Sequence, residues 1–309
     1  MDYKKAGRAF LYMILATICF TMLYTVWMIG TMTAMPIILN NFISEMMIFI
    51  PALAIVFFHG DKISVLVPFK KIRIPSALLI PLYVILLFPL VVFINSLSML
   101  FVDNTVVEMA DQILALPFWQ MLLSIGIFGP FVEEFVFRGV LLQSYQRSGR
   151  IIGSIVLTSI LFGMMHLNIN QFAYGAAMGI MFALLVEATG SVLSSFIAHA
   201  LFNSAEVVLM YMEKDVLGQA QNYMEEMEFK NIILISVGVY FVLAVIGTAL
   251  ALCLLVKIAN LEKRQEFFLG IPKCKKQGYK LVTVPLIVAI VISLTYMIGM
   301  EVIFKITGV

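Results

Sequence analysis

Long apolar runs separated by short polar segments constrain the fold of this chain more than any other feature of its sequence. In lipid, every main-chain N–H and C=O must find a partner within the protein, so a spanning segment is either a helix or a strand of a closed barrel. A helix of about 20 apolar residues crosses the hydrocarbon core of a bilayer. We predict nine such spans, at about residues 9–30, 42–59, 75–100, 117–144, 151–166, 171–188, 191–212, 231–256 and 281–303.

The composition agrees with a membrane protein. Hydrophobic residues make up 62% of the 309 residues, and charged residues make up 12%, against about 25% in soluble domains. We therefore predict an all-α, polytopic membrane helix bundle with about 8–9 transmembrane helices, whose surroundings are the lipid bilayer. A net charge of +2 gives no indication of nucleic-acid binding. Cys19 and Cys253 fall in apolar runs, which argues against a disulfide framework and against cysteine-ligated zinc.

The distribution of Lys and Arg predicts how the chain is oriented in the membrane. With the N-terminus in the cytoplasm, sixteen of the twenty basic residues fall on the inside and three on the outside, as the positive-inside rule requires. The outside loops are acidic instead, and the basic loop 257–280 either contacts anionic headgroups or only fixes the topology. The first run is not followed by a small-residue cleavage site, so we expect a retained anchor. The style of the sequence suggests a multi-pass protein of a bacterial cell membrane.

Three charged residues lie inside the fourth apolar run. Glu133, Glu134 and Arg138 lie within six consecutive positions of a span, although a charge near the bilayer centre costs about 2.5–3.5 kcal/mol or more. Glu134 and Arg138 are four residues apart, so they share a helix face and can pair. Glu133 has no basic residue three or four positions later, which leaves it available for chemistry. The alternative is that all three side chains only hold helices together.

Other polar residues are predicted to reach the same depth in the membrane. His59 lies at the end of the second span and is expected to be an interfacial residue, whereas His166 ends the fifth span. His199 and Asn203 are four residues apart on one face of the seventh span. At about 1.5 Å per residue, His166, His199, Asn203 and Glu133 all come near the middle of the bilayer. We therefore expect these side chains to converge on one site.

One Glu, two His and one Asn form a set of groups suited to hydrolysis. A buried carboxylate can take a proton from water, and a neutral imidazole can orient that water. A second imidazole and an amide N–H can bind the oxyanion of a tetrahedral intermediate. Since no Ser or Cys lies beside a base in a recognisable nucleophile motif, we predict direct attack by water. The alternative is that these groups only form hydrogen bonds between helices.

The polar residues resemble the three motifs of a protease family. Glu133-Glu134-x-x-x-Arg138, Phe162-x-x-x-His166 and His199-x-x-x-Asn203, in this order, resemble the motifs of the CPBP family. This family of CAAX proteases and bacteriocin-processing enzymes is also called Abi and includes the type II CAAX prenyl endopeptidase. The resemblance covers about residues 117–210, and further matching residues are Gly139, Leu167 and Asn168 after His166, Tyr174 and Gly179.

The resemblance implies an intramembrane glutamic endopeptidase that needs no cofactor. Glu133 and His166 would activate water, His199 and Asn203 would form the oxyanion site, and Glu134 and Arg138 would support Glu133. The substrate would be a membrane-associated peptide or protein, in CAAX-type processing, bacteriocin or signal-peptide maturation, or self-immunity. Because bacteria generally lack protein prenylation, we do not expect a prenylated substrate. The predicted division is 1–116 for the first three spans, 117–210 for the catalytic core, and 211–309 for C-terminal helices with the basic loop.

Three other functions stay open at this point. Glu133, His166 and His199 are also a possible set of three ligands for a catalytic zinc with an open fourth position, although the sequence has no His-Glu-x-x-His pair. A transporter would use carboxylates at the bilayer midplane, usually with broken helices in repeated halves, which we do not find. A non-catalytic scaffold or immunity protein would retain the fold and bind a partner peptide.

Overall fold

The chain folds into helices. The computed structural model describes residues 1–58, 60–102, 110–212, 226–273 and 280–307, and no strand occurs among them. Seven helices are long and apolar enough to cross a membrane, so the prediction of an all-α, polytopic membrane bundle is confirmed. These helices are α1 (Tyr3–Thr31), α2 (Ile37–Phe58), α4 (Ile74–Ser98), α11 (Ile169–Thr189), α12 (Val192–Met212), α14 (Glu226–Leu261) and α16 (Val284–Thr307).

The two remaining predicted spans also fall on helical segments. The fifth is the 15-residue helix α10 (Ile151–Met165). The fourth is a continuous run, composed of α7 (Phe118–Met121), η1 (Leu122–Phe128), α8 (Gly129–Glu134), η2 (Phe135–Leu141) and α9 (Leu142–Gln146). Short elements in the connections are α3 (Ile63–Leu66), α6 (Ala110–Leu114), α15 (Gln265–Gly270) and η3 (Ile271–Lys273). The predictions for His59, for much of the two acidic loops and for the middle of the basic loop lie outside the described residues.

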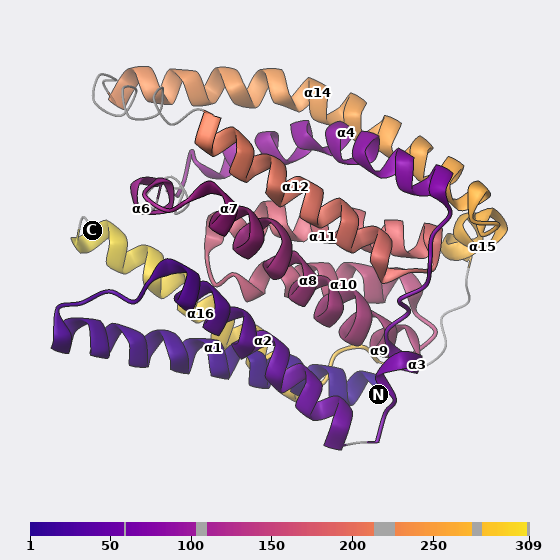
Figure 1. Ribbon diagram of the computed structural model, residues 1–309, viewed down its shortest axis with the longest axis horizontal. Helices are drawn as coiled ribbons and strands as arrows, with labels where there is room; N and C mark the ends of the chain where they lie inside the picture. The colour runs from indigo at the N-terminus through magenta and orange to yellow at the C-terminus, as the bar shows by residue number, and fades with distance from the viewer. Residues whose placement is uncertain (59, 103–109, 213–225, 274–279, 308–309) are drawn as a thin grey trace.

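The helices form a bundle whose central elements carry the polar motifs. In Figure 1, α10, α11, α12 and the run α7–α9 lie in the middle, with α4 and α14 on one side and α1, α2 and α16 on the other. One apolar cluster joins α1, α2 and α16 to the run and to α10, and a second joins α4 and α14 to α11 and α12. The motif residues therefore lie between two apolar clusters.

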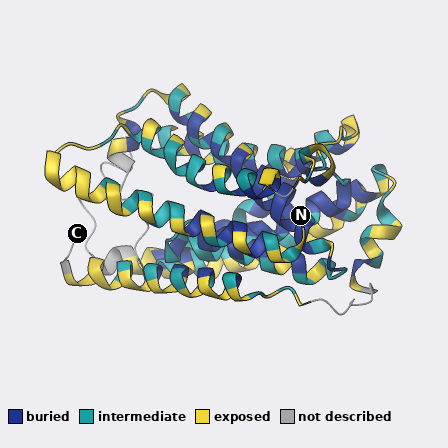
Figure 2. Ribbon diagram, turned by 90° about the horizontal axis from the view of Figure 1, so that it is seen from below, coloured by how far each residue is buried: buried dark blue, intermediate teal, exposed yellow. Residues whose placement is uncertain are grey.

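The outer surfaces of the bundle are apolar. Figure 2 shows exposed residues along the outward faces of the peripheral helices, and many of them are large hydrophobic residues such as Ile235 and Val245 of α14 and Ile298 of α16. Exposure of such side chains to water is unfavourable, by about 25 cal/mol for each Å² of apolar surface. Contact with lipid removes this cost, as expected of an integral, multi-pass membrane protein.

Close packing of α10 against α11 depends on small residues. A Cβ added at Gly163 would lie 2.5 Å from the carbonyl oxygen of Phe172, and one at Gly179 would lie 2.9 Å from Cα of Ser159. Small residues let helix backbones approach closely in membranes, where the hydrophobic effect does not drive helix association. This contact fixes α10, which ends at His166, against the helix that follows it.

The two ends of the bundle provide a test of orientation. The N-terminus, α3, α9 and α15 lie at one end, and α6 and the C-terminus lie at the other (Figure 1). We expect a cysteine replacing Lys305, which is 62% exposed near the C-terminus, to react with an impermeant thiol reagent in intact cells. The reason is that the positive-inside rule places the opposite, basic end in the cytoplasm. The background is a protein without Cys19, Cys253 and Cys274.

The matched control for this labelling is Lys70→Cys, because Lys70 lies in the exposed segment between α3 and α4 at the other end. It should react only after lysis. Reaction of Lys70→Cys, but not of Lys305→Cys, in intact cells would show that the orientation is reversed.

Candidate active site

The run α7–α9 departs twice from α-helical hydrogen bonding around the candidate residues. The N–H of Gly129 bonds to the carbonyl of Ser124, and the N–H of Leu142 bonds to that of Phe137, so both bonds span five residues. Such π-helical turns insert a residue into a helix and occur frequently at functional sites. Glu133 and Glu134 lie in the α-helical segment between the two π turns, and the second π turn carries Arg138.

The first π turn provides the docking point for α12. Pro130 has no N–H, so the preceding turn lacks one main-chain donor for its carbonyl groups. Two side chains of α12 donate to these carbonyls: Asn203 Nδ2 to Ile125 at 3.2 Å, and Ser204 Oγ to Gly126 at 3.4 Å. These two hydrogen bonds fix the position of α12 along the run. The helical turn before Asn203, which carries His199, therefore lies beside Glu133 and Glu134.

Glu134 and Arg138 form a buried ion pair. Glu134 Oε1 lies 2.8 Å from Arg138 Nη1, and the two side chains are 0% and 2% exposed. The guanidinium group also donates to the Gly179 carbonyl at 3.4 Å, and lies 4.3 Å from the ring centroid of Phe162 and 5.4 Å from that of Phe182. The pair predicted from the four-residue spacing is therefore present, and cation–π contacts surround the charge that it neutralises.

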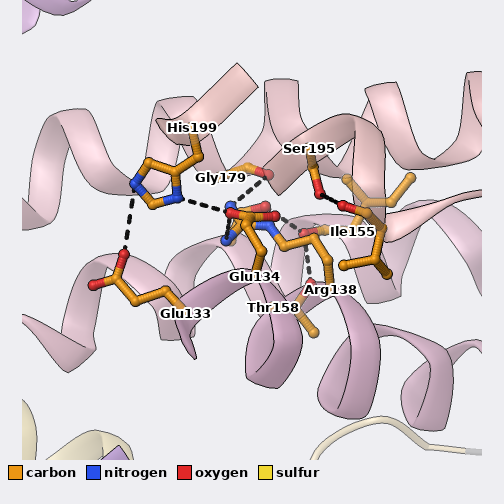
Figure 3. Close-up of polar contacts among 10 residues, drawn as sticks. Glu133, Glu134, Arg138, Ile155, Thr158, Gly179, Ser195 and His199 are labelled. Carbon is orange, nitrogen blue, oxygen red and sulfur yellow. Dashed lines mark hydrogen bonds and ion pairs between the residues drawn. The ribbon is translucent and has the colours of Figure 1, made fainter. Parts of the chain in front are cut away.

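His199 lies between the two carboxylates, as Figure 3 shows. Its Nδ1 is 3.0 Å from Glu134 Oε1, and its Nε2 is 3.5 Å from Glu133 Oε2. The ring stacks on Phe182 and meets Phe162 edge-on. Because Glu134 is the ionised partner of Arg138 and can only accept, we assign the Nδ1 proton to His199 as donor. The other ring nitrogen therefore faces Glu133, where a proton can be exchanged or shared.

His166 and Asn203 flank this centre. The ring of His166 meets Phe162 edge-on with centroids 5.2 Å apart, and His166 Cδ2 would lie 3.4 Å from a Cβ added at Gly175. Within the described residues no hydrogen bond joins His166 to Glu133, although the Glu133 carboxylate is close enough to interact electrostatically with it. Asn203 lies one helical turn beyond His199 on α12. The structure thus places Glu133, Glu134, Arg138 and His199 in direct contact, and His166 and Asn203 beside them.

The sequence analysis missed one polar residue of this neighbourhood. Glu45 of α2 is 8% exposed, and a Cβ added at Gly129 would lie 3.3 Å from its Oε1. Gly129 precedes Glu133 by one helical turn. The available signal was a single carboxylate inside the apolar span 42–59, which by itself points to function in a membrane. The aromatic partners Phe162 and Phe182 gave no comparable signal, because aromatic residues are common in apolar spans.

The described residues do not group three or more His, Cys, Asp or Glu side chains in an arrangement that would hold a metal ion. The alternative zinc site, with Glu133, His166 and His199 as ligands, thus gains no support from their relative positions.

Comparisons with known proteins point to one family. Residues 115–205, which include every candidate residue of the three motifs, match the family described as type II CAAX prenyl endopeptidase Rce1-like. The chain is also 28% identical over 116 residues to a protein of Bacillus subtilis (strain 168) named "Putative membrane peptidase YdiL". That match covers 38% of this chain and 44% of the relative, so the chain spans less than half of the relative's length. No solved structure matches the chain.

Proposed function

Residues 115–205 belong to the type II CAAX prenyl endopeptidase Rce1-like family, and on this premise we propose that the protein is an intramembrane glutamic endopeptidase. It hydrolyses a peptide bond in a membrane-associated peptide or protein. The observation that carries the proposal is His199 between Glu133 and Glu134, inside a membrane bundle. Residues 117–210 form the catalytic core, and the helices of 1–116 and 211–309 flank it.

Glu133 is the base in this mechanism. It has no basic partner on its own helix, so its carboxylate can take a proton from a water molecule. The water oxygen forms a bond to the scissile carbonyl carbon, and the carbonyl electron pair moves to the oxygen. His166, whose ring meets Phe162 edge-on, orients the water. When the C–N bond breaks, the proton held by Glu133 passes to the departing nitrogen.

His199 and Asn203 stabilise the negative charge that develops on the carbonyl oxygen. Glu134 accepts the Nδ1–H of His199, which fixes the ring so that an Nε2–H can donate to the oxyanion. One N–H of Asn203 is bonded to Ile125, and its second N–H is available for the oxyanion. Arg138 balances the charge of Glu134 and keeps that carboxylate in place, so its role is supporting.

We expect Asn203→Ala to lower kcat by about 10²–10³, the usual effect of removing one oxyanion donor, with little change in KM. Steady-state kinetics with a membrane peptide measure both quantities. The control is Ser204→Ala, which removes the neighbouring contact to the run but no group of the oxyanion site. If both variants lose activity equally, Asn203 acts only through docking of α12.

The proposed substrate class rests on the family match and on the position of the site within a membrane bundle. Peptide segments that reach it belong to membrane-associated proteins, in CAAX-type processing, bacteriocin or signal-peptide maturation, or self-immunity. The reaction requires neither a prenyl group nor a metal. We place the protein in a bacterial cell membrane with its N-terminus in the cytoplasm.

Quantitative mass spectrometry of peptides tests the proposal in cells. Membranes that contain the wild-type protein should accumulate new peptide termini that are absent with Glu133→Gln, and the uncleaved precursor should accumulate in the variant. A scaffold or immunity protein would behave identically with either residue. Identical peptide profiles, together with full complementation by Glu133→Gln, would overturn the enzymatic proposal.

A further inference from the structure

Glu45 is a buried carboxylate that the mechanism above does not use. It lies in the middle of the spanning helix α2, and its Oε2 has no hydrogen-bond partner within the described residues. An ionised carboxylate without a partner is costly in a membrane, so such a residue either serves a function or holds a proton. Its Oε1 approaches Gly129, which precedes Glu133 by one helical turn, so Glu45 lies on the side of the run that carries Glu133.

The packing of α2 fixes this approach. Phe42 stacks on Phe128 with ring centroids 5.4 Å apart, and Phe49 meets Phe135 edge-on at 5.3 Å. One turn before Glu45, the amide of Asn41 donates to Ser124 Oγ at 2.9 Å. These contacts lie before and after Glu45 along α2, so its carboxyl group is held against the run rather than turned toward lipid.

The balance of charge in the site favours a protonated, neutral Glu45. If Glu133 and Glu134 are both carboxylates, Arg138 balances one of the two negative charges and only a protonated His199 can balance the other, which makes the four groups neutral. An ionised Glu45 would leave one net negative charge buried in the membrane. The titratable and charged groups near Glu133 are Glu45 on α2, Glu134 and Arg138 on its own run, His166 on α10, Tyr174 on α11 and His199 on α12.

We propose that Glu45 is a positioning residue that stays protonated while Glu133 carries the negative charge. The inference rests on the proposed function of Glu133 as the base. Glu133 lies beside nitrogen groups of His199, His166 and Arg138, whereas one Glu45 oxygen has no hydrogen-bond partner within the described residues. Two neighbouring carboxyl groups that cannot both ionise divide their protons in this way.

A protonated Glu45 keeps a second negative charge away from the transition state. The attack of water creates an oxyanion beside His199, and a second negative charge on α2 would destabilise it. Activity should therefore fall at alkaline pH when Glu45 loses its proton. This limb of the pH–rate profile belongs to Glu45 and not to the substrate.

The pH dependence of kcat for the full-length protein in lipid nanodiscs tests this assignment. With Glu45→Gln, which stays neutral, we expect the alkaline limb to disappear or move to higher pH, with kcat at the optimum retained within a few-fold and KM unchanged. Glu45→Asp should restore the limb. The control, Glu206→Gln, changes another carboxylate in a spanning helix, three residues after Asn203, and should leave the profile as in the wild type. An unchanged limb in Glu45→Gln, or an equal loss of activity at every pH, would overturn the proposal.

Infrared spectroscopy gives a second measurement that does not depend on activity. The difference spectrum between the wild type and Glu45→Gln should contain the carbonyl band of one protonated carboxylic acid, and the same band should remain in Glu206→Gln. A difference spectrum without this band would contradict the assignment. If the wild type fails to cleave any peptide, or if Glu133→Gln is fully active, the proposed function fails instead, so the two failures can be distinguished.

Discussion

Glu133→Gln is expected to lower kcat by about 10²–10⁴, the range that a general base contributes. Gln keeps the shape of the side chain and its hydrogen bonding, but cannot take a proton from water. The fold should remain, because Glu133 belongs to neither the Glu134–Arg138 pair nor an apolar cluster. Peptide cleavage by the purified protein measures the rate, and co-purification of uncleaved peptide shows whether the variant retains its substrate.

The control for this experiment is Glu206→Gln, which removes a carboxylate from α12 without touching the motif residues. It should retain activity within a few-fold. Turnover by Glu133→Gln at the wild-type rate would remove Glu133 from the mechanism. Loss of a monodisperse, folded protein in Glu133→Gln would mean that the carboxylate is structural.

Arg138→Met is expected to destabilise the fold and to abolish activity. Met keeps much of the side-chain volume but leaves Glu134 buried without its cation, and breaking a buried pair on one side costs about 3–5 kcal/mol. His199 would also lose the oriented carboxylate that accepts its Nδ1 proton. Thermal unfolding in detergent and the yield of monodisperse protein measure stability, and peptide cleavage measures activity.

The comparison for this variant is Arg147→Met. Arg147 is 47% exposed and lies 3.7 Å from Asp61, so its pair is partly solvated and contributes little. The Arg147→Met variant should give the same yield of monodisperse protein as the wild type and the same thermal unfolding in detergent. If Arg138→Met did so too and retained full activity, the buried pair would have no role in stability or catalysis.

Local sequence rules were sufficient for the features that depend on residues close together in the chain. Apolar length predicted the seven helices that are long and apolar enough to cross a membrane, and the four-residue spacing predicted the Glu134–Arg138 pair. The distribution of Lys and Arg grouped the basic segments at one end, where the structure has α3, α9 and α15 (Figure 1). Whether that end faces the cytoplasm is still a prediction. Depth estimates gave the shared level of Glu133 and His199, but not the directions in which the side chains point.

Features that depend on tertiary packing could not be predicted. Hydropathy is the same for an α and a π turn, so the five-residue bonds around Glu133 left no trace in the sequence pattern. The contact of His199 with Glu134 joins residues 65 positions apart, and it depends on how α12 docks onto the first π turn. The place of Glu45 in the site could not be predicted either, because it depends on the packing of α2 against Gly129.

Cleavage of one synthetic membrane peptide, chosen from the termini found in cells, tests the central claim most directly. The purified protein is washed with chelator, its metal content is determined, and products are identified by mass spectrometry for the wild type and for Glu133→Gln. We predict that the metal-free wild type cleaves one peptide bond at an undiminished rate, and that Glu133→Gln leaves the peptide intact. Loss of wild-type activity in chelator that returns with stoichiometric zinc would contradict the account, and would make Glu133, His166 and His199 metal ligands.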